Sequence, residues 1–465
     1  MDASVYGLSW YAANAVARDP APQLAQDIDT DVCVVGGGLA GLTTALEIAR
    51  RGWPVVLLEG RRIAWSASGR NTGFVLPGFA QDPAVIADRV GIDHARTLWA
   101  LSEQGVDYVR RAIAEHRMEG VDPTDGWLNV SKIDRAAEMA ADAELMRDAF
   151  GANVEFLDAD RVRARLKSER YFQAIHYPTA FHINPLNYAF GLARAAENAG
   201  ARIYEETPVL HIDPEGVRKR VVTPQGRVRA AHVVLAGNVH LGSLMPDISG
   251  TLLPITTYVI ATKPLGDALA EAMAYRGAVS DSDWADNHYR PTADNRLIWS
   301  GRMSTRPKNP KRFVNALRRD IARTYPQLGK VDVEFAWSGT LGSPLHRMPN
   351  VGELSPGLWV ASGFSGHGLN TTAIAGVLLA RAITEGDRAW TAFNPFELIW
   401  AGGRAGLAFA RGRYLAHRAH AAIAGYLSRR RDIARRARLA EEAAPEQTAQ
   451  ALDVPIASKK RGKAR

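Results

Sequence analysis

The chain has 465 residues, of which 46% are hydrophobic and 23% charged, as in a globular protein of two or three domains; its single cysteine, Cys33, excludes an internal disulfide and a zinc-type cysteine cluster. We expect a soluble, cytoplasmic protein, because no run of about 18 apolar residues is present and because Asp2 and Asn14 lie where a secretion signal would be apolar. The net charge of +8 arises from residues 401–465, which hold 15 Lys+Arg against 5 Asp+Glu, so it concerns solubility, self-association or surface adhesion rather than the chemistry of the main fold.

The first predicted elements follow a strand-helix-strand order. Residues 1–29 mix aromatic, small and proline residues without a strict period, and we expect a surface arm. The apolar run 30–35 predicts a parallel strand buried on both faces. A helix is predicted over 39–51, ended by Gly52, and a second buried strand over 54–58.

The middle of the chain changes character twice. Residues 86–165 have mainly helical periodicity and are predicted to be an inserted region. A further helix is expected over 186–199. Three short strands separated by glycine turns then return to the first domain, over 201–204, 217–222 and 228–235.

The last third contains a sheet, a strand-helix pair and a tail. Residues 254–303 alternate apolar and polar side chains, which indicates antiparallel strands, and a helix is predicted over 310–325. A final buried strand at 358–361 leads into a helix over 370–384. The tail is predicted to form one or two basic helices over 404–440, and residues 441–465 are predicted to be disordered.

A glycine motif lies between the first strand and the first helix. Gly36, Gly38 and Gly41 form GxGxxG in that position, where Gly36 permits a tight turn and Gly38 lets the backbone approach a pyrophosphate. Gly41 lets the helix pack closely on the strand, and the helix N-terminus presents free N–H groups. This pattern predicts a dinucleotide site.

An acidic residue completes that unit at the end of the second strand. Glu59 can accept hydrogen bonds from both hydroxyls of an adenosine ribose, and it would repel a 2′-phosphate. NADP is therefore disfavoured despite the neighbouring Arg61 and Arg62. The unit by itself does not separate NAD from FAD.

Two further segments favour FAD. The loop Trp65–Gly73 (WSASGRNTG) offers hydroxyls, an amide and a guanidinium, so Arg70 could pair with the pyrophosphate and Ser68 could bond the ribityl chain. Residues 359–372 (WVASGFSGHGLNTT) place a second glycine loop before a second helix N-terminus. That terminus would stabilise the negative charge of a reduced flavin.

Together these segments resemble the D-amino acid oxidase superfamily of flavoproteins, which includes sarcosine oxidase, glycine oxidase and D-amino acid dehydrogenase. The resemblance covers about residues 30–395. The stretches SWYAANA, ASGRNTG, HINPLNYAFGLARAA, VVLAGN and GFSGHGL look most like the gamma-glutamylputrescine oxidoreductase branch.

The resemblance implies a mixed α/β fold with a Rossmann-like FAD-binding domain and a discontinuous, mostly antiparallel substrate domain. The expected boundaries are an arm at 1–29, an FAD domain at 30–85, 171–250 and 340–395, a substrate domain at 86–170 and 251–339, and a basic tail at 396–465. The FAD-binding residues expected from the motifs and the resemblance are Gly36, Gly38, Leu39, Ala40, Gly41, Glu59, Gly60, Arg61, Ser68, Arg70, Asn71, Thr72, Val209, Gly363, Gly366, His367, Gly368 and Leu369. No metal is expected.

The mode of flavin attachment is also implied by the resemblance. Covalent members use a cysteine or histidine, but the early position here is Ser66, Cys33 lies in the first strand, and His346 is a poor late candidate. We therefore expect non-covalent FAD. Val209 is expected beside the adenine.

The reaction implied by the resemblance moves a hydride from the carbon that bears an amine to flavin N5. The resulting imine hydrolyses to an aldehyde or oxo acid plus an amine. His367 is the first catalytic candidate, since it is expected at the flavin edge; it can equally be read as a helix cap. Tyr258, His288, Tyr289 and Arg302 are candidates for lining the pocket, although ordinary sheet packing or a surface ion pair is the stronger interpretation of each.

Two departures from the family pattern bear on substrate and acceptor. Asn370 stands where sarcosine oxidase relatives place a carboxylate-binding lysine, which disfavours a short amino acid. The run 287–290 contains no counterpart of their oxygen-activating lysine, so the electron acceptor is oxygen or another, unknown oxidant. Whether the chain forms a homo-oligomer is left open.

Three other functions remain as alternatives. The first is an enzyme like D-amino acid dehydrogenase or sarcosine/glycine oxidase. An aromatic hydroxylase ranks low, because 352–368 lacks the expected Gly-Asp flavin motif. The third is a flavoprotein that acts on nucleic acid through its basic tail, which ranks low because the tail has few aromatic side chains, such as Tyr414 and Tyr426, to stack on bases.

Overall fold

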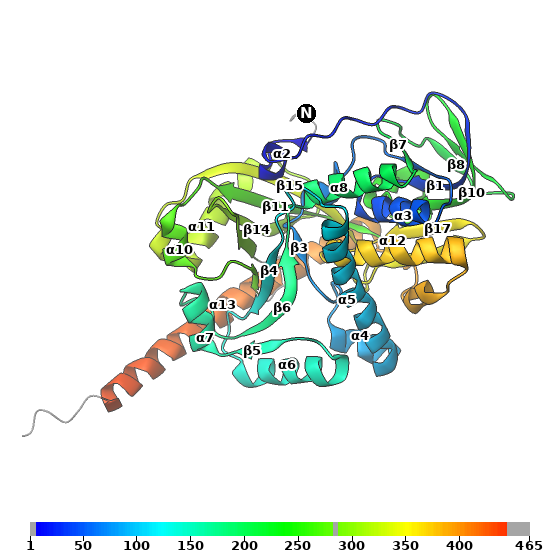
Figure 1. Ribbon diagram of the computed structural model, residues 1–465. Coiled ribbons are helices and arrows are strands. Elements are labelled where there is room, and N and C mark those ends of the chain that lie inside the picture. Colours follow the sequence, from blue (N-terminus) through cyan, green and yellow to red (C-terminus); the bar gives the residue numbers. More distant parts are fainter. Residues whose placement is uncertain (1–5, 282–286, 444–465) are drawn as a thin grey trace, which may run out of the picture.

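The computed structural model describes residues 6–281 and 287–443, which form two sheets surrounded by helices (Figure 1). Among these residues the first sheet has eight strands, six of them in the order β16-β17-β10-β1-β2-β7. The strands are β1 (Ile28–Val35), β2 (Val55–Leu58), β7 (Arg202–Tyr204), β8 (His211–Asp213), β9 (Lys219–Val222), β10 (Arg227–Leu235), β16 (Asn350–Ser355) and β17 (Leu358–Ser362). β1, β2, β7, β10 and β17 run parallel to one another.

The second sheet has nine strands in the described part of the chain and is antiparallel except for the β4–β12 pair. Its strands are β3 (Phe74–Val75), β4 (Thr124–Val130), β5 (Glu155–Leu157), β6 (Ala174–His182), β11 (Leu253–Thr262), β12 (Ala278–Asp281), β13 (His288–Pro291), β14 (Leu297–Ser304) and β15 (Val333–Ser343). One mainly parallel and one mainly antiparallel sheet confirm the predicted fold class, a mixed α/β protein.

The helices include two long ones, α5 and α13. The α-helices are α2 (Trp10–Ala13), α3 (Leu39–Arg50), α4 (Pro83–Val90), α5 (Ile92–Glu115), α6 (Ala136–Phe150), α7 (Ala159–Leu166), α8 (Pro185–Asn198), α9 (Pro246–Ser249), α10 (Asp267–Ala272), α11 (Val314–Thr324), α12 (Gly368–Glu385) and α13 (Gly403–Ala443). Short 3-10 helices are η1 (Ala67–Gly69), η2 (Asn238–Leu244), η3 (Pro310–Phe313), η4 (Pro326–Leu328) and η5 (Ala389–Phe393).

The first sheet is covered on both faces, as its continuous apolar strands require. On β1, Val32 and Val34 face the core that contains α3, α8 and α12, while Cys33 and Val35 face the opposite core beneath β8 and β9. Close helix packing depends on a small residue, since a Cβ on Gly376 of α12 would lie 2.7 Å from the Cβ of Thr43 in α3. The strand-helix-strand unit of the first 60 residues is therefore where the sequence predicts it.

The second sheet also has two buried faces. Tyr258, Tyr289 and Trp299 lie in a core with residues of α7, α10 and α11. Val259 and Trp337 lie on the other face, in the large core shared with the first domain. Neighbouring residues of one strand thus serve different cores, because successive side chains point to opposite faces.

The segment 86–165 is more mixed than its periodicity predicts. It contains α4 to α7, but β4 and β5 lie between them and pair with β6. β3, β6 and β15 belong to the second sheet, although β3, β6 and the end of β15 fall in segments predicted for the first domain. The chain therefore crosses between the sheets more often than the predicted boundaries imply.

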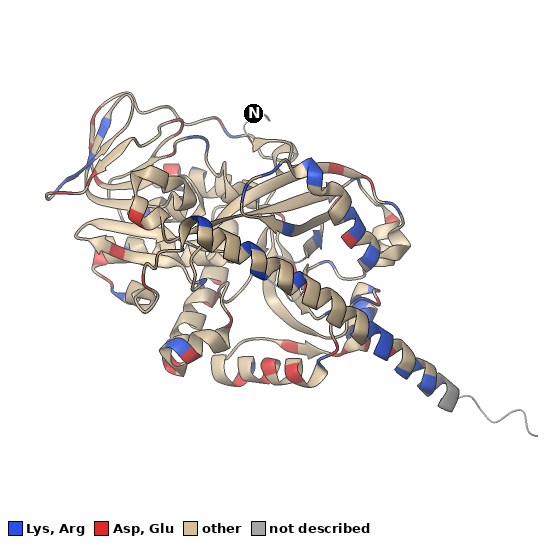
Figure 2. Cartoon of the chain, turned by 180° about the vertical axis from the view of Figure 1, so that it is seen from behind, with Lys and Arg blue, Asp and Glu red and all other residues tan. Residues whose placement is uncertain are grey.

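The basic tail forms a single helix, α13, which lies across the back of the molecule and projects beyond it (Figures 1 and 2). The predicted disordered segment, 441–465, begins inside this helix, and its residues from 444 onward lie outside the described part of the chain. None of the helices described is both long enough and apolar enough to cross a lipid bilayer.

Candidate functional site

Four parallel strands end at the same edge of the first sheet. The register pairs Val35 of β1 with Leu58 of β2 and with Leu235 of β10, and Leu235 pairs with Val360 of β17. The residues that follow these strands therefore meet at one edge of the sheet. At this edge successive strands have been added on opposite sides of β1, which is where sheets of this kind commonly bind ligands. All three segments predicted to hold the cofactor start there.

The first glycine loop has the geometry that its motif predicts. Gly36 has φ +116°, and a Cβ there would lie 2.8 Å from the backbone of Ala236. A Cβ on Gly41 would lie 2.0 Å from the carbonyl oxygen of Gly36, so only glycine lets α3 begin this close to β1. Gly38 is the N-cap of α3 and leads into Leu39 and Ala40.

Glu59 joins the glycine loop to the end of β2. One carboxylate oxygen accepts from the backbone N–H of Gly37 at 2.7 Å, and the other accepts from Arg61 at 2.8 Å, just past Gly60. Burial raises the pKa of Glu59, while these two backbone donors oppose that shift. Each oxygen retains a second lone pair, which matches the predicted contact with ribose hydroxyls.

The loop at 65–73 folds against the start of α3. Ser68 accepts a hydrogen bond from the backbone N–H of Leu39 at 3.1 Å. Asn71 bonds the loop to itself, since its amide donates to the carbonyls of Ala67 and Ser68 and its oxygen accepts from Gly73. The loop is therefore a preformed shelf beside the helix N-terminus.

Hydrogen bonds anchor Arg70 in this shelf, and its side chain is partly buried. Its Nε donates to the carbonyl of Trp65 at 2.8 Å, and its own carbonyl accepts from Trp337 Nε1 of β15 at 2.9 Å. Burial lowers the pKa of Arg70. A cation held this way would gain from an anionic partner.

Sequence reasoning missed Arg290, which ties the shelf to the second sheet. This buried arginine donates from Nε to the carbonyl of Thr72 at 2.8 Å and from Nη2 to the carbonyl of Ile183 at 3.0 Å. It also lies 5.9 Å from the ring of Tyr11 in the N-terminal arm. Its other two partners are side chains, His182 Nδ1 at 3.3 Å and Tyr11 Oη at 3.4 Å, and the two backbone carbonyls carry no sequence signal.

Replacing Arg290 should loosen the shelf. We expect Arg290→Met to lower the free energy of unfolding by about 2–4 kcal/mol, because buried carbonyls lose their donors. Urea unfolding measures this. Arg227→Met is the control, since Arg227 forms an exposed ion pair with Asp27 and should cost less than about 1 kcal/mol. Equal effects of the two substitutions would contradict the assigned role.

The second glycine loop leads into α12. Gly363 has φ +73°, and a Cβ there would lie 2.6 Å from Pro344, so this position requires glycine. Gly366 and Gly368 differ, because no atom lies within 4 Å of the place where their Cβ would stand. The N-terminus of α12, which continues through Leu369, thus faces open space without a side-chain cap.

His367 is the N-cap residue of α12. Its half-buried ring donates a hydrogen bond to the carbonyl of Pro77. Burial lowers the pKa of His367 from 6.5 to about 4, and the nearby positive charges of Arg347 and His288 add to this effect. The imidazole is therefore neutral at pH 7.

The residues of the site fit FAD in their donor chemistry. The glycine loop, Glu59 and the shelf suit the adenosine diphosphate part, and the open N-terminus of α12 suits an electron-rich ring system. The profile of the DAO family, described as FAD dependent oxidoreductase, matches residues 31–382. The chain belongs to this family.

Individual relatives of this DAO-family chain agree with the assignment. It is 34% identical to gamma-glutamylputrescine oxidoreductase of Escherichia coli over 391 residues, which cover 83% of this chain and 91% of the relative. It is 32% identical to the probable oxidoreductase OrdL of Haemophilus influenzae, covering 81% and 88%. Glycine oxidase of Geobacillus kaustophilus has a similar fold, with TM-score 0.68 and 21% identity over 80% of this chain and 98% of that one.

The other predicted catalytic residues do not lie with His367. Tyr258 stacks on Phe313 at 3.7 Å, and Tyr289 stacks on Trp299 at 4.1 Å, both in the core beneath α10 and α11. Arg302 forms an ion pair with Asp320 of α11. The structure thus brings the FAD-binding candidates together. Tyr258, Tyr289 and Arg302 lie instead on the side of the second sheet that packs against α10 and α11.

Several further candidates have partners within the protein. Val209 is half-buried just before β8 and packs in the core of β1 and β2. Both ring nitrogens of His346 are engaged, one with the carbonyl of Glu397 at 3.1 Å and one with the N–H of Met348 at 3.1 Å. Asn370 donates to the carbonyl of Gly78 at 3.0 Å and so fastens α12 to the neighbouring loop.

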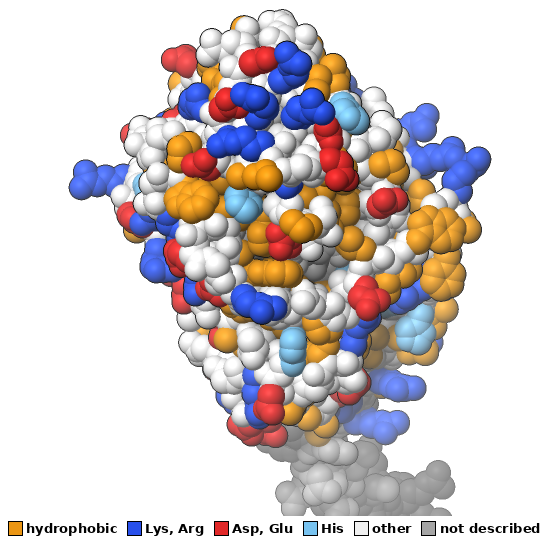
Figure 3. Space-filling view, turned by 90° about the vertical axis from the view of Figure 1, so that its right-hand side faces the viewer, with side chains coloured by type: hydrophobic (Ala, Val, Ile, Leu, Met, Phe, Trp, Pro, Cys, Tyr) orange, Lys and Arg blue, Asp and Glu red, His pale blue; other side chains and the backbone are white. Residues whose placement is uncertain are grey.

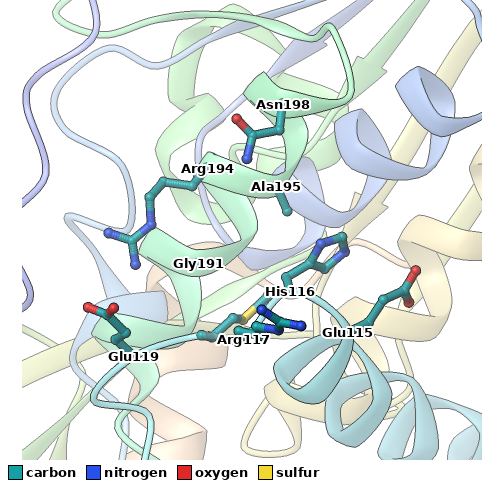
Figure 4. A pocket seen from close by; sticks show the side chains of 9 residues that line it. Glu115, His116, Arg117, Glu119, Gly191, Arg194, Ala195 and Asn198 are labelled. Atoms are coloured by element: carbon teal, nitrogen blue, oxygen red, sulfur yellow. The ribbon is translucent and has the colours of Figure 1, made fainter.

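A separate surface pocket of about 440 Å³ lies between the end of α5 and α8. Figure 4 shows Arg194 and Glu119 on one side of it and Glu115 and His116 on the other. None of its lining residues belongs to the three segments described above, so it is distinct from the candidate FAD site.

Glu59 gives a direct test of the adenosine end. We expect Glu59→Gln to weaken FAD binding by about tenfold, because the amide replaces a charged acceptor of ribose hydroxyls with a weaker one. Fluorescence titration of flavin-free protein measures the affinity. The control is Glu353→Gln, which alters a glutamate that also accepts from a backbone N–H, that of Gly357, in the same sheet. Unchanged affinity in the Glu59 variant would refute the assignment.

Proposed function

We propose that this chain catalyses FAD-dependent oxidation of an amine with a polyamine-like or amino-acid-like body, gamma-glutamylputrescine being the leading candidate. The supporting observation is the convergence of the glycine loop, the shelf and the open α12 terminus with neutral His367 at one edge of the first sheet. The 34% identity to the E. coli gamma-glutamylputrescine oxidoreductase supports the choice of substrate.

The chain's own residues would hold the cofactor at both ends. Gly36, Gly38 and Glu59 would bind the adenosine diphosphate, and Ser68 and Arg70 the pyrophosphate and ribityl chain. When bound, FAD supplies the acceptor for a hydride from the carbon that carries the amine. We assign the first sheet with its helices to FAD binding and the second sheet to the substrate.

Non-covalent attachment is supported by the state of the alternative attachment residues. Cys33 is fully buried in β1, and burial raises the pKa of its thiol to about 12. His346 uses both ring nitrogens within the protein, and the hydroxyl of Ser66 lies 2.7 Å from Nε2 of His240.

At the substrate end, a neutral His367 could accept a hydrogen bond from the substrate amine without competing for its proton. Arg347 is close enough to lower the pKa of His367, so it places positive charge where the carboxylate of a glutamyl group would be favoured. Oxidation converts the substrate amine to an imine, and water hydrolyses the imine to an aldehyde or oxo acid plus an amine. Such a reaction belongs to polyamine catabolism, which we place in the cytoplasm, with oxygen or another oxidant as acceptor.

An anaerobic screen of amines tests this proposal. Mixing the purified protein with gamma-glutamylputrescine should bleach its absorbance at about 450 nm, because the flavin becomes reduced. Readmitting oxygen then shows whether oxygen is the acceptor, since fast recovery of the colour requires it. A flavin that no amine in the panel bleaches would overturn the proposed function.

A further inference from the structure

The inner face of α13 fixes how this helix lies on the body. The side chains buried at helical spacing are Ala410, Tyr414, Ala421, Ser428 and Asp432. The hydroxyl of Tyr414 accepts from the N–H of Met303 at 3.3 Å, and Asp432 accepts from Arg163 at 2.9 Å. One face of the helix therefore packs on the body of the protein, against β14 at Tyr414 and against α7 at Asp432.

The opposite face is apolar although it points to solvent. Among the α13 side chains that the structure describes, seven large apolar ones are 46–68% exposed, and the seventh in chain order, Leu439, falls on the same side of the helix as Tyr414. We define the apolar stripe as the other six: Phe409, Leu415, Ile423, Tyr426, Leu427 and Ile433. With 3.6 residues per turn, they fall within an arc of about 120° opposite Tyr414. Trp400, which is 70% exposed, lies just before the helix.

Arginines border the apolar stripe on both sides. At the same helical spacing, Arg404 and Arg411 fall along one border, and Arg413, Arg431 and Arg438 along the other. Arg430 falls within the arc, and its guanidinium lies over the ring of Tyr426, 5.9 Å from the ring centroid. Between residues 403 and 439 the sequence has a single acidic residue, Asp432, and that one is buried. Figure 2 shows the row of basic positions along the helix.

One other face of the molecule differs in its charge pattern. The face seen in Figure 3 carries basic and acidic side chains interspersed with one another. The match to the family profile ends at residue 382, before α13 begins at Gly403. The arginine-bordered apolar stripe is thus a property of a segment outside the matched FAD-dependent region.

The apolar side chains and the arginines together indicate which kind of partner this face would bind. A second copy docked through the same face would bring arginine against arginine with no acidic complement. Nucleic acid would satisfy the arginines but leave the aliphatic side chains against a polar backbone. A bilayer with anionic headgroups satisfies both, because apolar side chains enter the acyl boundary while arginines meet the phosphates.

We propose that α13, together with Trp400, holds the enzyme on the surface of a membrane that contains anionic lipid. The helix lies in the interface with Tyr414 and Asp432 toward the protein and the apolar stripe toward the lipid. This proposal does not depend on the substrate.

Flotation of the full chain with vesicles tests the proposal. The protein should float with vesicles of phosphatidylcholine containing about one third phosphatidylglycerol, and much less with phosphatidylcholine alone, because each arginine near an anionic surface adds about fivefold to the partition coefficient. The combined variant Phe409→Ser, Ile423→Ser, Leu427→Ser should bind at least about a hundredfold more weakly. The matched control is Val85→Ser, Leu145→Ser, Val217→Ser, three side chains exposed by 44–89% elsewhere on the molecule, which should bind like the parent.

The same variants distinguish the competing occupants. The melting temperature and flavin content of each variant must equal the parent's, which separates loss of binding from loss of fold. Absence of flotation with anionic vesicles, or equal flotation of the stripe variant, overturns the proposal. So does a lipid-free oligomer that the stripe variant dissociates in sedimentation equilibrium, or binding of a short RNA with no binding to vesicles.

Discussion

Replacing Gly368 with valine should give a folded protein that binds FAD more weakly. No atom lies within 4 Å of a Cβ at this position, so the protein itself can accommodate the larger side chain. The added side chain would enter the space in front of the α12 N-terminus, where the flavin is proposed to lie. We expect FAD affinity to fall by about ten- to a hundredfold, the usual consequence of overfilling a packed site. Titration of flavin-free protein with FAD measures it.

The matched control for this prediction is Gly412→Val. Gly412 is also a helical glycine with no atom within 4 Å of its Cβ position, but it lies in α13. Both variants should keep the melting temperature of the flavin-free parent. If the Gly368 variant binds FAD like the parent, the flavin does not lie at this helix terminus.

Replacing His367 should slow substrate oxidation without moving its pH dependence. The pKa of His367 is lowered to about 4 by burial, so the ring is neutral above about pH 5 and contributes no titration step near pH 6.5. We expect His367→Ala to lower the rate of anaerobic flavin reduction by about ten- to a hundredfold, because one oriented hydrogen-bonding group is lost. His94→Ala is the control, since that ring also bonds a backbone carbonyl, that of Ala392, elsewhere.

The same histidine affects stability in a defined direction. As the pH falls, the unfolded chain binds a proton near 6.5 whereas the folded chain does so only at about 4, so His367 destabilises the fold progressively between these values. The alanine variant should therefore lose less stability than the parent between pH 7 and 4.5. A rate profile in which only the parent shows a step near pH 6.5 would contradict the neutral imidazole.

The FAD end of the site is where sequence reasoning was most effective. The glycine motif, the acid that ends β2 and the glycine loop before α12 combine local conformational needs with strand and helix periodicity. Each of these features depends on residues close together in the chain. The parallel strands then bring the three segments to one edge, as the general rule for such sheets requires.

The substrate end was much less predictable. The strands at 254–303 were correctly expected, but both of their faces are buried, so alternation does not reveal which face meets the first domain. Tyr258 and Tyr289 therefore look equivalent in sequence to their neighbours, yet His288 and Arg290 are the residues oriented toward the shelf and α12. A shift of one residue along a strand moves the side chain to the opposite face of the sheet.

Other features have no local signal at all. β4 (Thr124–Val130) lies among helices and becomes a strand only through pairing with β6 and β12. Arg290 acts on carbonyls more than 100 residues away in the chain. The docking of α13 likewise depends on Arg163 and Met303, which no periodicity within the helix identifies.

The recovery of flavin from the purified chain tests the central claim most directly. After acid precipitation, the supernatant should contain FAD at about one molecule per chain, and the protein pellet should be colourless, because the site holds the cofactor without a covalent bond. A purified protein that has no flavin and cannot be loaded with FAD would contradict the account of the site, and a yellow pellet would contradict non-covalent attachment.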